Sequence, residues 1–293
     1  MQKVKEPKVG VVILTRNRNG DVKECLKSLQ RNSYKNKKII VIDGNINGGY
    51  AKGNNAGIVK LLRQKCEYIL LVNDDTVSNP NLISKLISSF HIDPSIGIVG
   101  PTIAYFNKPR TIWYSGGNFN RAFCITTHLN MNKGVRYART GYTDFVTGCC
   151  MMVRKNVFEK VGLLDVRFEY YFEDAFFCKK AFEKGYKSFV IKDVLIRHRV
   201  SSTLGNTGTN IMTPLRAYYF ARNPFIIICD EKSFLLKCTQ LFGQLSIRLP
   251  YYMLNILYSG QLRSIGWYLK GFREGFWYFL GGRLLKHQRK KIE

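Results

Sequence analysis

Apolar and polar residues alternate in blocks along the first part of the chain, and each block has the length of one secondary-structure element. Continuous runs rich in β-branched residues at Val9–Leu14, Lys38–Ile42 and Tyr68–Val72 predict strands buried inside a sheet. Between these runs, Asp21–Arg31 and Ala51–Lys65 have the apolar spacing and length of helices. Strand and helix in alternation predict right-handed βαβ units and a parallel sheet.

The same patterns continue downstream. We expect, in order, a helix at Leu82–Phe90, strands at Ile96–Val99 and Phe145–Arg154, helices at Asn156–Val161 and Glu173–Lys184, and short strands at Ser188–Ile191 and Val194–Ile196. After about Thr213 the chain mixes Leu, Ile, Phe, Trp and Tyr with Lys and Arg. The pattern therefore predicts an α/β domain over residues 1–212 and a basic, aromatic helical region over residues 213–293.

Polar residues follow the first three predicted strands at the point where each strand ends. Thr15 follows the first strand, Asp43 the second, and Asn73-Asp74-Asp75 the third. Ligands of open α/β sheets bind beyond the carboxyl ends of the strands. We therefore expect these residues to meet at one crevice.

The chain is strongly basic: 46 Lys and Arg residues against 20 acidic residues give a formal net charge of +26. Such an excess attracts polyanions, so nucleic acid, anionic lipid and a phosphate-rich small substrate all fit. The sequence holds no RRM, KH, helix-turn-helix or zinc signature, which disfavours nucleic acid. None of the eight cysteines forms a C-x-x-C pair, so we expect free thiols in a reducing cytosol.

Hydropathy argues against an integral membrane protein. No apolar run reaches the ~18 residues that a spanning helix needs, and Val9–Leu14 is too short for the apolar core of a signal peptide. The C-terminal third, with Trp267 and Trp277, suits peripheral attachment to an anionic membrane surface. The alternative is that its helices pack on the first domain and end in a solvated basic tail.

Two segments have the chemistry of a metal site. Adjacent carboxylates at Asp74 and Asp75 repel each other, and a hard cation such as Mg²⁺ or Mn²⁺ would relieve that repulsion. The alternative is a turn whose Asp caps the next helix. His198 lies between two arginines after a strand, which suits a phosphate and metal site, although an isolated histidine is equally compatible with a structural role.

Two further segments could contribute a base and an anion site. Glu173 and Asp174 open a helix, where carboxylates are ordinary partners of the helix dipole; either could also serve as a general base. The Gly/Asn-rich turn 47–55 allows close approach of the backbone and could present N–H groups to an anion. By itself this turn is a weak signal, since it matches neither the Walker loop nor G-x-G-x-x-G.

Taken together, these segments resemble the family 2 glycosyltransferases, especially their rhamnosyltransferase-like branch. The resemblance rests on motifs in the family's order: VVILTRNR, VID, NGGYAKGNNAGI, LLVNDDTV, the long stretch from Asp144 to Ile191, HRVSSTLG and YYFARN. It covers roughly residues 8–225, with an echo at KGFREG (270–275). It implies a Rossmann-like GT-A domain with a mixed, mostly parallel sheet, followed by a helical C-terminal region.

The resemblance also implies roles for individual residues. Asp174 would be the general base of an inverting transfer, supported by Glu173. Asp75 and His198 would hold a divalent metal, Mg²⁺ or Mn²⁺, on the donor diphosphate. The residues implied in nucleotide-sugar binding are Thr15, Arg18, Asp43, Gly49, Asn54 and Asp74.

The implied partners are a UDP- or dTDP-sugar donor and a glycan or lipid-linked acceptor of cell-surface polysaccharide or glycolipid assembly. We expect the protein in the cytoplasm, peripheral at the inner face of the cell membrane, without nucleic acid; an oligomer is compatible with the sequence. Two features depart from the family pattern: Asn73 stands first in the DXD-like triplet, and only three residues separate Asp43 from Asn47. The short loop supports an alternative, a catalytically degenerate scaffold, and the charge supports a second, a basic nucleic-acid binder.

Overall fold

The computed structural model describes residues 6–15, 20–200 and 212–283, and the chain forms two compact units. The first unit comprises residues 1–118, 127–166 and 174–207. The second comprises residues 119–126, 167–173 and 208–293. Arg18 and the basic tail beyond residue 283 lie outside the described residues.

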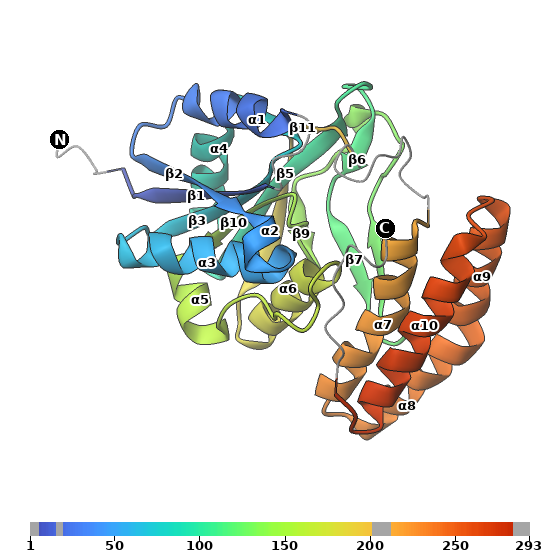
Figure 1. The fold of residues 1–293 in the computed structure, drawn as a ribbon. Helices are drawn as coiled ribbons and strands as arrows, with labels where there is room; N and C mark the ends of the chain where they lie inside the picture. Colours follow the sequence, from blue (N-terminus) through green and yellow to red (C-terminus); the bar gives the residue numbers. More distant parts are fainter. Residues whose placement is uncertain (1–5, 16–19, 201–211, 284–293) are drawn as a thin grey trace. The chain divides into compact units, whose positions relative to one another are not determined.

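The first unit alternates strands and helices along its first hundred residues (Figure 1). In chain order its elements are β1 (Val9–Thr15), α1 (Asp21–Gln30), β2 (Lys37–Asp43), α2 (Gly44–Asn47), α3 (Tyr50–Arg63), β3 (Tyr68–Asn73), β4 (Thr76–Ser78), α4 (Leu82–Ser89), β5 (Ile96–Tyr105), β6 (Ile112–Tyr114), β9 (Gly141–Thr143), β10 (Cys150–Arg154), α5 (Lys155–Val161), α6 (Glu173–Glu183) and β11 (Lys187–His198). The hairpin of β7 (Gly117–Asn120) and β8 (Ile125–His128) carries the chain into the second unit and back.

In the described chain, one mixed sheet has the order β2-β1-β3-β10-β5-β11-β4, with β6 beside β5 and β9 beside β11. Strand β1 is parallel to β2 and β3, as the alternation predicts. Strand β10 is antiparallel to both β3 and β5, so the sheet is mixed, as the resemblance implies. The chain reaches β10 through short strands and turns, without the helical crossover that a parallel strand requires.

Three predicted strands differ from those observed. Strand β2 is at the edge of the sheet, which leaves Val41 43% exposed rather than buried. The predicted strand from Phe145 begins only at Cys150, because a turn precedes it in which the Cys150 N–H donates to Thr147 O. The two predicted strands after Tyr186 are one strand, β11, with register shifts around Val194.

Glycines let helix α3 pack closely on strand β1. A Cβ on Gly53 would come within 2.4 Å of Leu14 Cδ1, and one on Gly57 within 2.5 Å of Val12 Cγ1. Both glycines belong to the Gly/Asn-rich segment, and both lie inside the helix rather than in the turn before it. In this part of the segment, glycine therefore serves helix–sheet packing.

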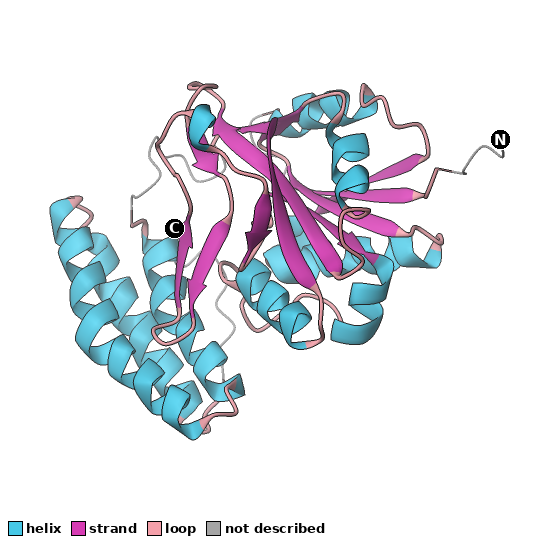
Figure 2. Cartoon of the chain, turned by 180° about the vertical axis from the view of Figure 1, so that it is seen from behind, coloured by secondary structure: helices cyan, strands magenta, loops and turns pink. Residues whose placement is uncertain are grey.

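The second unit is helical (Figure 2). Its elements are α7 (Pro214–Asp230), α8 (Phe234–Gly243), a π-helical segment (Gln244–Arg248), α9 (Leu249–Tyr258) and α10 (Arg263–Phe279). Helices α7 and α10 pack along each other, since Cβ atoms on Gly271 and Gly275 would come within 2.2 Å of Tyr218 O and 2.8 Å of Arg222 O. The glycines of the KGFREG motif thus form part of the contact between these two helices. None of the helices in the described ranges combines the length and hydropathy of a bilayer-spanning segment.

Candidate active site

The first three strands end side by side, as the sequence predicts. Thr15 pairs with Asp43 across β1 and β2, and Leu14 pairs with Asn73 across β1 and β3. Thr15 is 6% exposed, whereas the Asp43 side chain is exposed. The polar residues at these strand ends therefore share one edge of the sheet.

Strand β11 brings His198 to the DXD-like triplet. It pairs antiparallel with β4, so that His198 lies opposite Thr76, the residue after Asp75. The Nε2 atom of His198 is 3.0 Å from Oδ1 of Asp75. The backbone N–H of Arg199 also donates to Asp75 O at 3.0 Å. The fold thus brings together two residues that the resemblance implies at one metal site.

Both side chains of this pair are buried: Asp75 is 4% exposed and His198 6%. Burial alone would raise the pKa of Asp75, but the contact with His198, a backbone hydrogen bond and the nearby Arg199 together lower it. Asp75 is therefore a carboxylate at neutral pH. Asp74, beside it, is 8% exposed.

The pair has the donor atoms that a divalent cation needs. Asp75 Oδ1 contacts only Nε2 of His198, and Nδ1, the other nitrogen of that ring, has no hydrogen-bond partner among the described residues, although both side chains are buried. Carboxylate oxygen and imidazole nitrogen suit a divalent cation such as Mn²⁺. Within the described ranges, no group of three His, Cys, Asp or Glu side chains forms a metal site. A cation held here would take its other ligands from phosphate oxygens and water.

An aromatic side chain that the sequence analysis missed packs against this pair. Trp113, on β6, is half-buried and lies edge-to-face with His198, with 4.4 Å between ring centroids. It has the same relation to His128 at 4.8 Å. The segment that carries Trp113 has no regular pattern in the sequence, so only the pairing of β6 with β5 reveals this contact.

A second carboxylate, Asp174, is held by backbone groups of the first unit. Its Oδ2 accepts from the Gly148 N–H at 2.8 Å, and its Oδ1 accepts from the Ala175 N–H at 2.7 Å. The carbonyl of Gly148 accepts from the Tyr50 hydroxyl at 2.6 Å. A Cβ at Gly148 would come within 2.4 Å of that hydroxyl. Gly148, within the stretch from Asp144 to Ile191 that resembles the family, therefore anchors Asp174.

The environment of Asp174 suits proton transfer. Desolvation by burial raises its pKa, and the hydrogen bonds from Gly148 and Ala175 only partly offset this. A carboxylate with a raised pKa is a stronger base than one exposed to water. The side chain is partly exposed, so a substrate hydroxyl could reach it. Glu173, the first residue of α6, is 6% exposed.

The remaining predicted residues have local structural partners. Asp43 accepts from the Asn45 N–H at 2.7 Å and caps α2. Gly49 adopts φ 95°, a conformation that favours glycine, at the start of α3. Asn54 is buried and donates to Tyr50 O one turn earlier.

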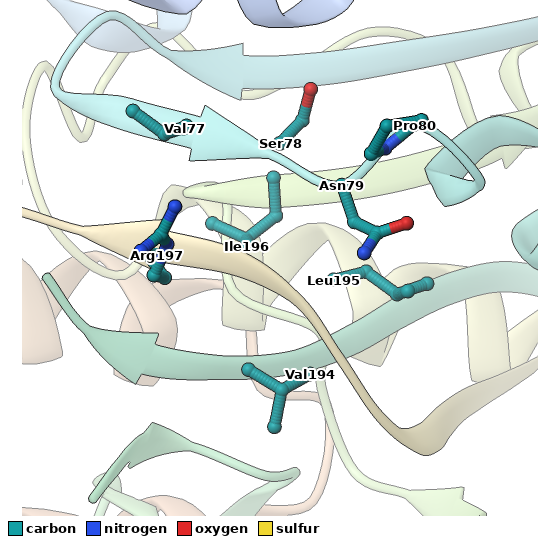
Figure 3. A pocket seen from close by; sticks show the side chains of 8 residues that line it. All are labelled: Val77, Ser78, Asn79, Pro80, Val194, Leu195, Ile196 and Arg197. Carbon is teal, nitrogen blue, oxygen red and sulfur yellow. The ribbon is translucent and has the colours of Figure 1, made fainter. Parts of the chain in front are cut away.

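The cations near His198 are engaged in different ways. Arg199 pairs with Asp21 at 3.0 Å and with Glu24 at 2.6 Å, both on α1, and its guanidinium stacks on Phe106. Arg197, two residues earlier, helps line a small hollow of about 230 Å³. Figure 3 shows that the other lining side chains come from Val77–Pro80 and Val194–Ile196. The hollow includes none of the predicted site residues.

Comparisons with known proteins identify relatives of the chain. Residues 7–210 match the family described as "Glycosyltransferase like family 2". A dTDP-rhamnosyl transferase from Shigella flexneri is 26% identical over 229 residues, which cover 77% of this chain and 72% of that protein. A low-salt glycan biosynthesis hexosyltransferase from Haloferax volcanii is 26% identical over 228 residues, 75% of this chain and 66% of that protein.

The fold has solved counterparts. A mannosyltransferase from Pyrobaculum calidifontis, in complex with GDP-Man and Mn²⁺, matches with a TM-score of 0.55 and 13% identity over 93% of this chain and 88% of its own. This likeness confirms the predicted GT-A fold with its mixed sheet and helical C-terminal region.

Proposed function

The chain belongs to the family 2-like glycosyltransferases, and on that premise we propose that it is an inverting enzyme that transfers a sugar from a nucleoside diphosphate donor to a hydroxyl of a glycan or lipid-linked acceptor. The observation that carries the proposal is the buried pair of Asp75 and His198, next to the end of strand β3. The pair supplies a carboxylate oxygen and an imidazole nitrogen, which are donor types that a divalent metal accepts.

Each residue then has one task. Asp75 and His198 would hold a divalent metal, and Thr15, Asp43 and Asp74 would lie along the nucleoside. When bound, the metal supplies Lewis-acid stabilisation of the leaving diphosphate. Asp174 takes the proton from the acceptor hydroxyl as that oxygen attacks the anomeric carbon, and the bond from that carbon to the diphosphate oxygen breaks.

A UDP- or dTDP-sugar is our proposed donor, in line with the dTDP-rhamnosyl transferase relative. The proposed acceptors belong to cell-surface polysaccharide or glycolipid assembly. Nucleic acid is not needed to account for the basic charge, because a diphosphate donor and anionic lipid are both polyanionic partners.

The test is calorimetric titration of UDP, dTDP and GDP, each with and without Mn²⁺, on the wild type and on Asp75→Ala. We expect one nucleotide to bind tightly, only with metal and only when Asp75 is present. Binding without either requirement would remove the metal from the proposal. No binding of any nucleotide would favour the degenerate scaffold, because the loop after Asp43 is short.

We also propose peripheral association with the inner face of the cell membrane through the second unit. Large apolar side chains on α8, α9 and the π-helical segment between them are more than half exposed: Phe234, Leu235, Phe242, Leu245, Tyr251, Leu254, Leu257 and Tyr258. Lys232 and Arg263 lie just before α8 and at the start of α10, where they could contact anionic headgroups. A lipid-linked acceptor lies in the membrane, so this association would bring the enzyme to its acceptor.

A further inference from the structure

The loop that leads into α6 has a strained backbone. Glu169, Tyr171 and Phe172 have φ values of 57°, 65° and 73°, in the left-handed region that residues with a side chain rarely adopt. Such a backbone persists only when its surroundings hold it in place. The loop continues without a break into Glu173 and Asp174, the first two residues of α6.

Two buried side chains of α7 bind the carbonyl groups of this loop. The Asn223 amide donates to the carbonyls of Phe168, Tyr170 and Tyr171 at 3.1, 2.7 and 2.9 Å. The Arg222 guanidinium donates to the carbonyls of Arg167 and Phe168 at 2.6 and 3.1 Å. Both side chains are 0% exposed.

A neighbour on α7 strengthens the hold on this loop. The Tyr219 hydroxyl donates to Glu169 Oε2 at 2.5 Å. Tyr219, Arg222 and Asn223 all belong to the YYFARN motif, to which donor binding and proton transfer assign no role. The motif therefore has a function that the loop geometry can explain.

We propose that Arg222 and Asn223 are positioning residues for transfer: they hold Arg167–Phe172 in the one backbone conformation that fixes the start of α6, and with it the carboxylate of Asp174. This inference rests on the proposed role of Asp174 as the base. We call the hydrogen bonds from Arg222 and Asn223 to this loop the clamp. Loss of the clamp would leave donor binding intact and slow the chemical step, because a base displaced by about 1 Å can lose on the order of 100-fold in rate.

The second unit offers a matched control. Gln240 is also 0% exposed and donates to a backbone carbonyl, that of Arg121 at 2.7 Å, but in the β7–β8 hairpin. Gln240→Ala therefore removes a comparable buried hydrogen bond without touching the loop before α6. Asn223→Ala removes the three hydrogen bonds that this side chain donates to that loop.

The experiment compares the full-length wild type, Asn223→Ala and Gln240→Ala by three readouts. Hydrogen–deuterium exchange reports on residues 167–172, calorimetry gives the affinity for UDP, dTDP and GDP with Mn²⁺, and release of nucleoside diphosphate from UDP-glucose, dTDP-rhamnose and GDP-mannose gives turnover. For Asn223→Ala we expect faster exchange in the loop and at least about tenfold lower kcat, with unchanged nucleotide affinity. Gln240→Ala should change neither loop exchange nor kcat.

Other results would overturn the inference. Unchanged loop exchange in Asn223→Ala, or an equal loss of kcat in Gln240→Ala, would reduce the clamp to general fold stability. If the wild type releases no nucleotide from any donor, the proposed function fails, and the exchange pattern alone decides whether the clamp exists. Should Asn223→Ala not fold, Tyr219→Phe, which removes only the hydroxyl on Glu169, provides the same comparison.

Discussion

The imidazole of His198 lies 3.0 Å from the carboxylate of Asp75, and the antiparallel pairing of β4 with β11 brings the two residues together. The contact is shielded from water on both sides. It therefore offers several direct tests of the proposed chemistry.

Replacing His198 should weaken only the metal-dependent binding of nucleoside diphosphate. In His198→Gln we expect the affinity for nucleoside diphosphate with Mn²⁺ to fall at least about tenfold, because removal of a ligating side chain takes a donor from the metal. Titration with and without Mn²⁺ measures this difference. His91→Gln, at an exposed position, is the control. Equal affinities in the two variants would remove His198 from the metal site.

Replacing the proposed base should separate catalysis from binding. Asp174→Asn keeps the shape of the side chain but cannot accept a proton, so kcat should fall by about 10²–10⁴-fold with nucleotide affinity retained. Steady-state kinetics and calorimetry check this together. The control is Asp193→Asn, a carboxylate in a partly exposed pair with Lys85. Retained turnover in Asp174→Asn would assign the base elsewhere.

The raised pKa of Asp174 predicts a pH profile. The base must be ionised, so kcat should fall as the pH drops through its pKa, at a pH above the ~3.9 of an ordinary aspartate. A folded-state pKa above the unfolded value stabilises the fold at low pH, and this contribution is lost as the pH rises through it. The wild type should therefore lose this part of its stability as the pH rises from acid through the pKa of Asp174. Kinetics and thermal melts across pH test both statements, and a pH-independent kcat in a folded protein would contradict the first.

The glycines of α3 should be sensitive to an added methyl group. In Gly53→Ala the new Cβ would lie 2.4 Å from Leu14, so we expect a loss of about 1–3 kcal/mol in the free energy of unfolding. Gly266→Ala, in α10, meets nothing within 4 Å and should be neutral or stabilising by about 0.5–1 kcal/mol. Denaturant titration compares the two, and equal values would mean that α3 can shift away from β1.

The exposed apolar side chains of α9 should mediate membrane binding. Leu254→Asp adds a charge where a 65%-exposed leucine would enter the headgroup region, so flotation with phosphatidylserine vesicles should fall. The control is Ile92→Asp, 61% exposed in the first unit. If sedimentation shows instead that Leu254→Asp only dissociates an oligomer, this face binds a second copy of the chain.

The sequence predicted the elements that local pattern determines and missed those that depend on distant partners. The runs around β1, β3 and α3 predicted their elements within about two residues, since periodicity is a local property. The antiparallel direction of β10 and the edge position of β2 depend on strand order, which no local pattern encodes.

In the candidate site, too, the sequence predicted single residues but not the contacts between distant segments. The carboxylates Asp75 and Asp174 stood out as candidates, because adjacent acids at a strand end or a helix start are visible in the sequence. Trp113, which packs on His198, and Gly148, which donates to Asp174, come from separate segments of the first unit. Only the paired strands reveal these contacts.

The buried donors of the C-terminal helices have a consequence for synthesis of the chain. The loop at 167–172 binds Arg222 and Asn223, and the carbonyls at Arg121, Phe123 and Cys124 bind Gln240, Gln244 and Arg248. A ribosome delivers both loops well before these helices. A product that ends before α7 would therefore lack the hydrogen bonds that these side chains donate to both loops.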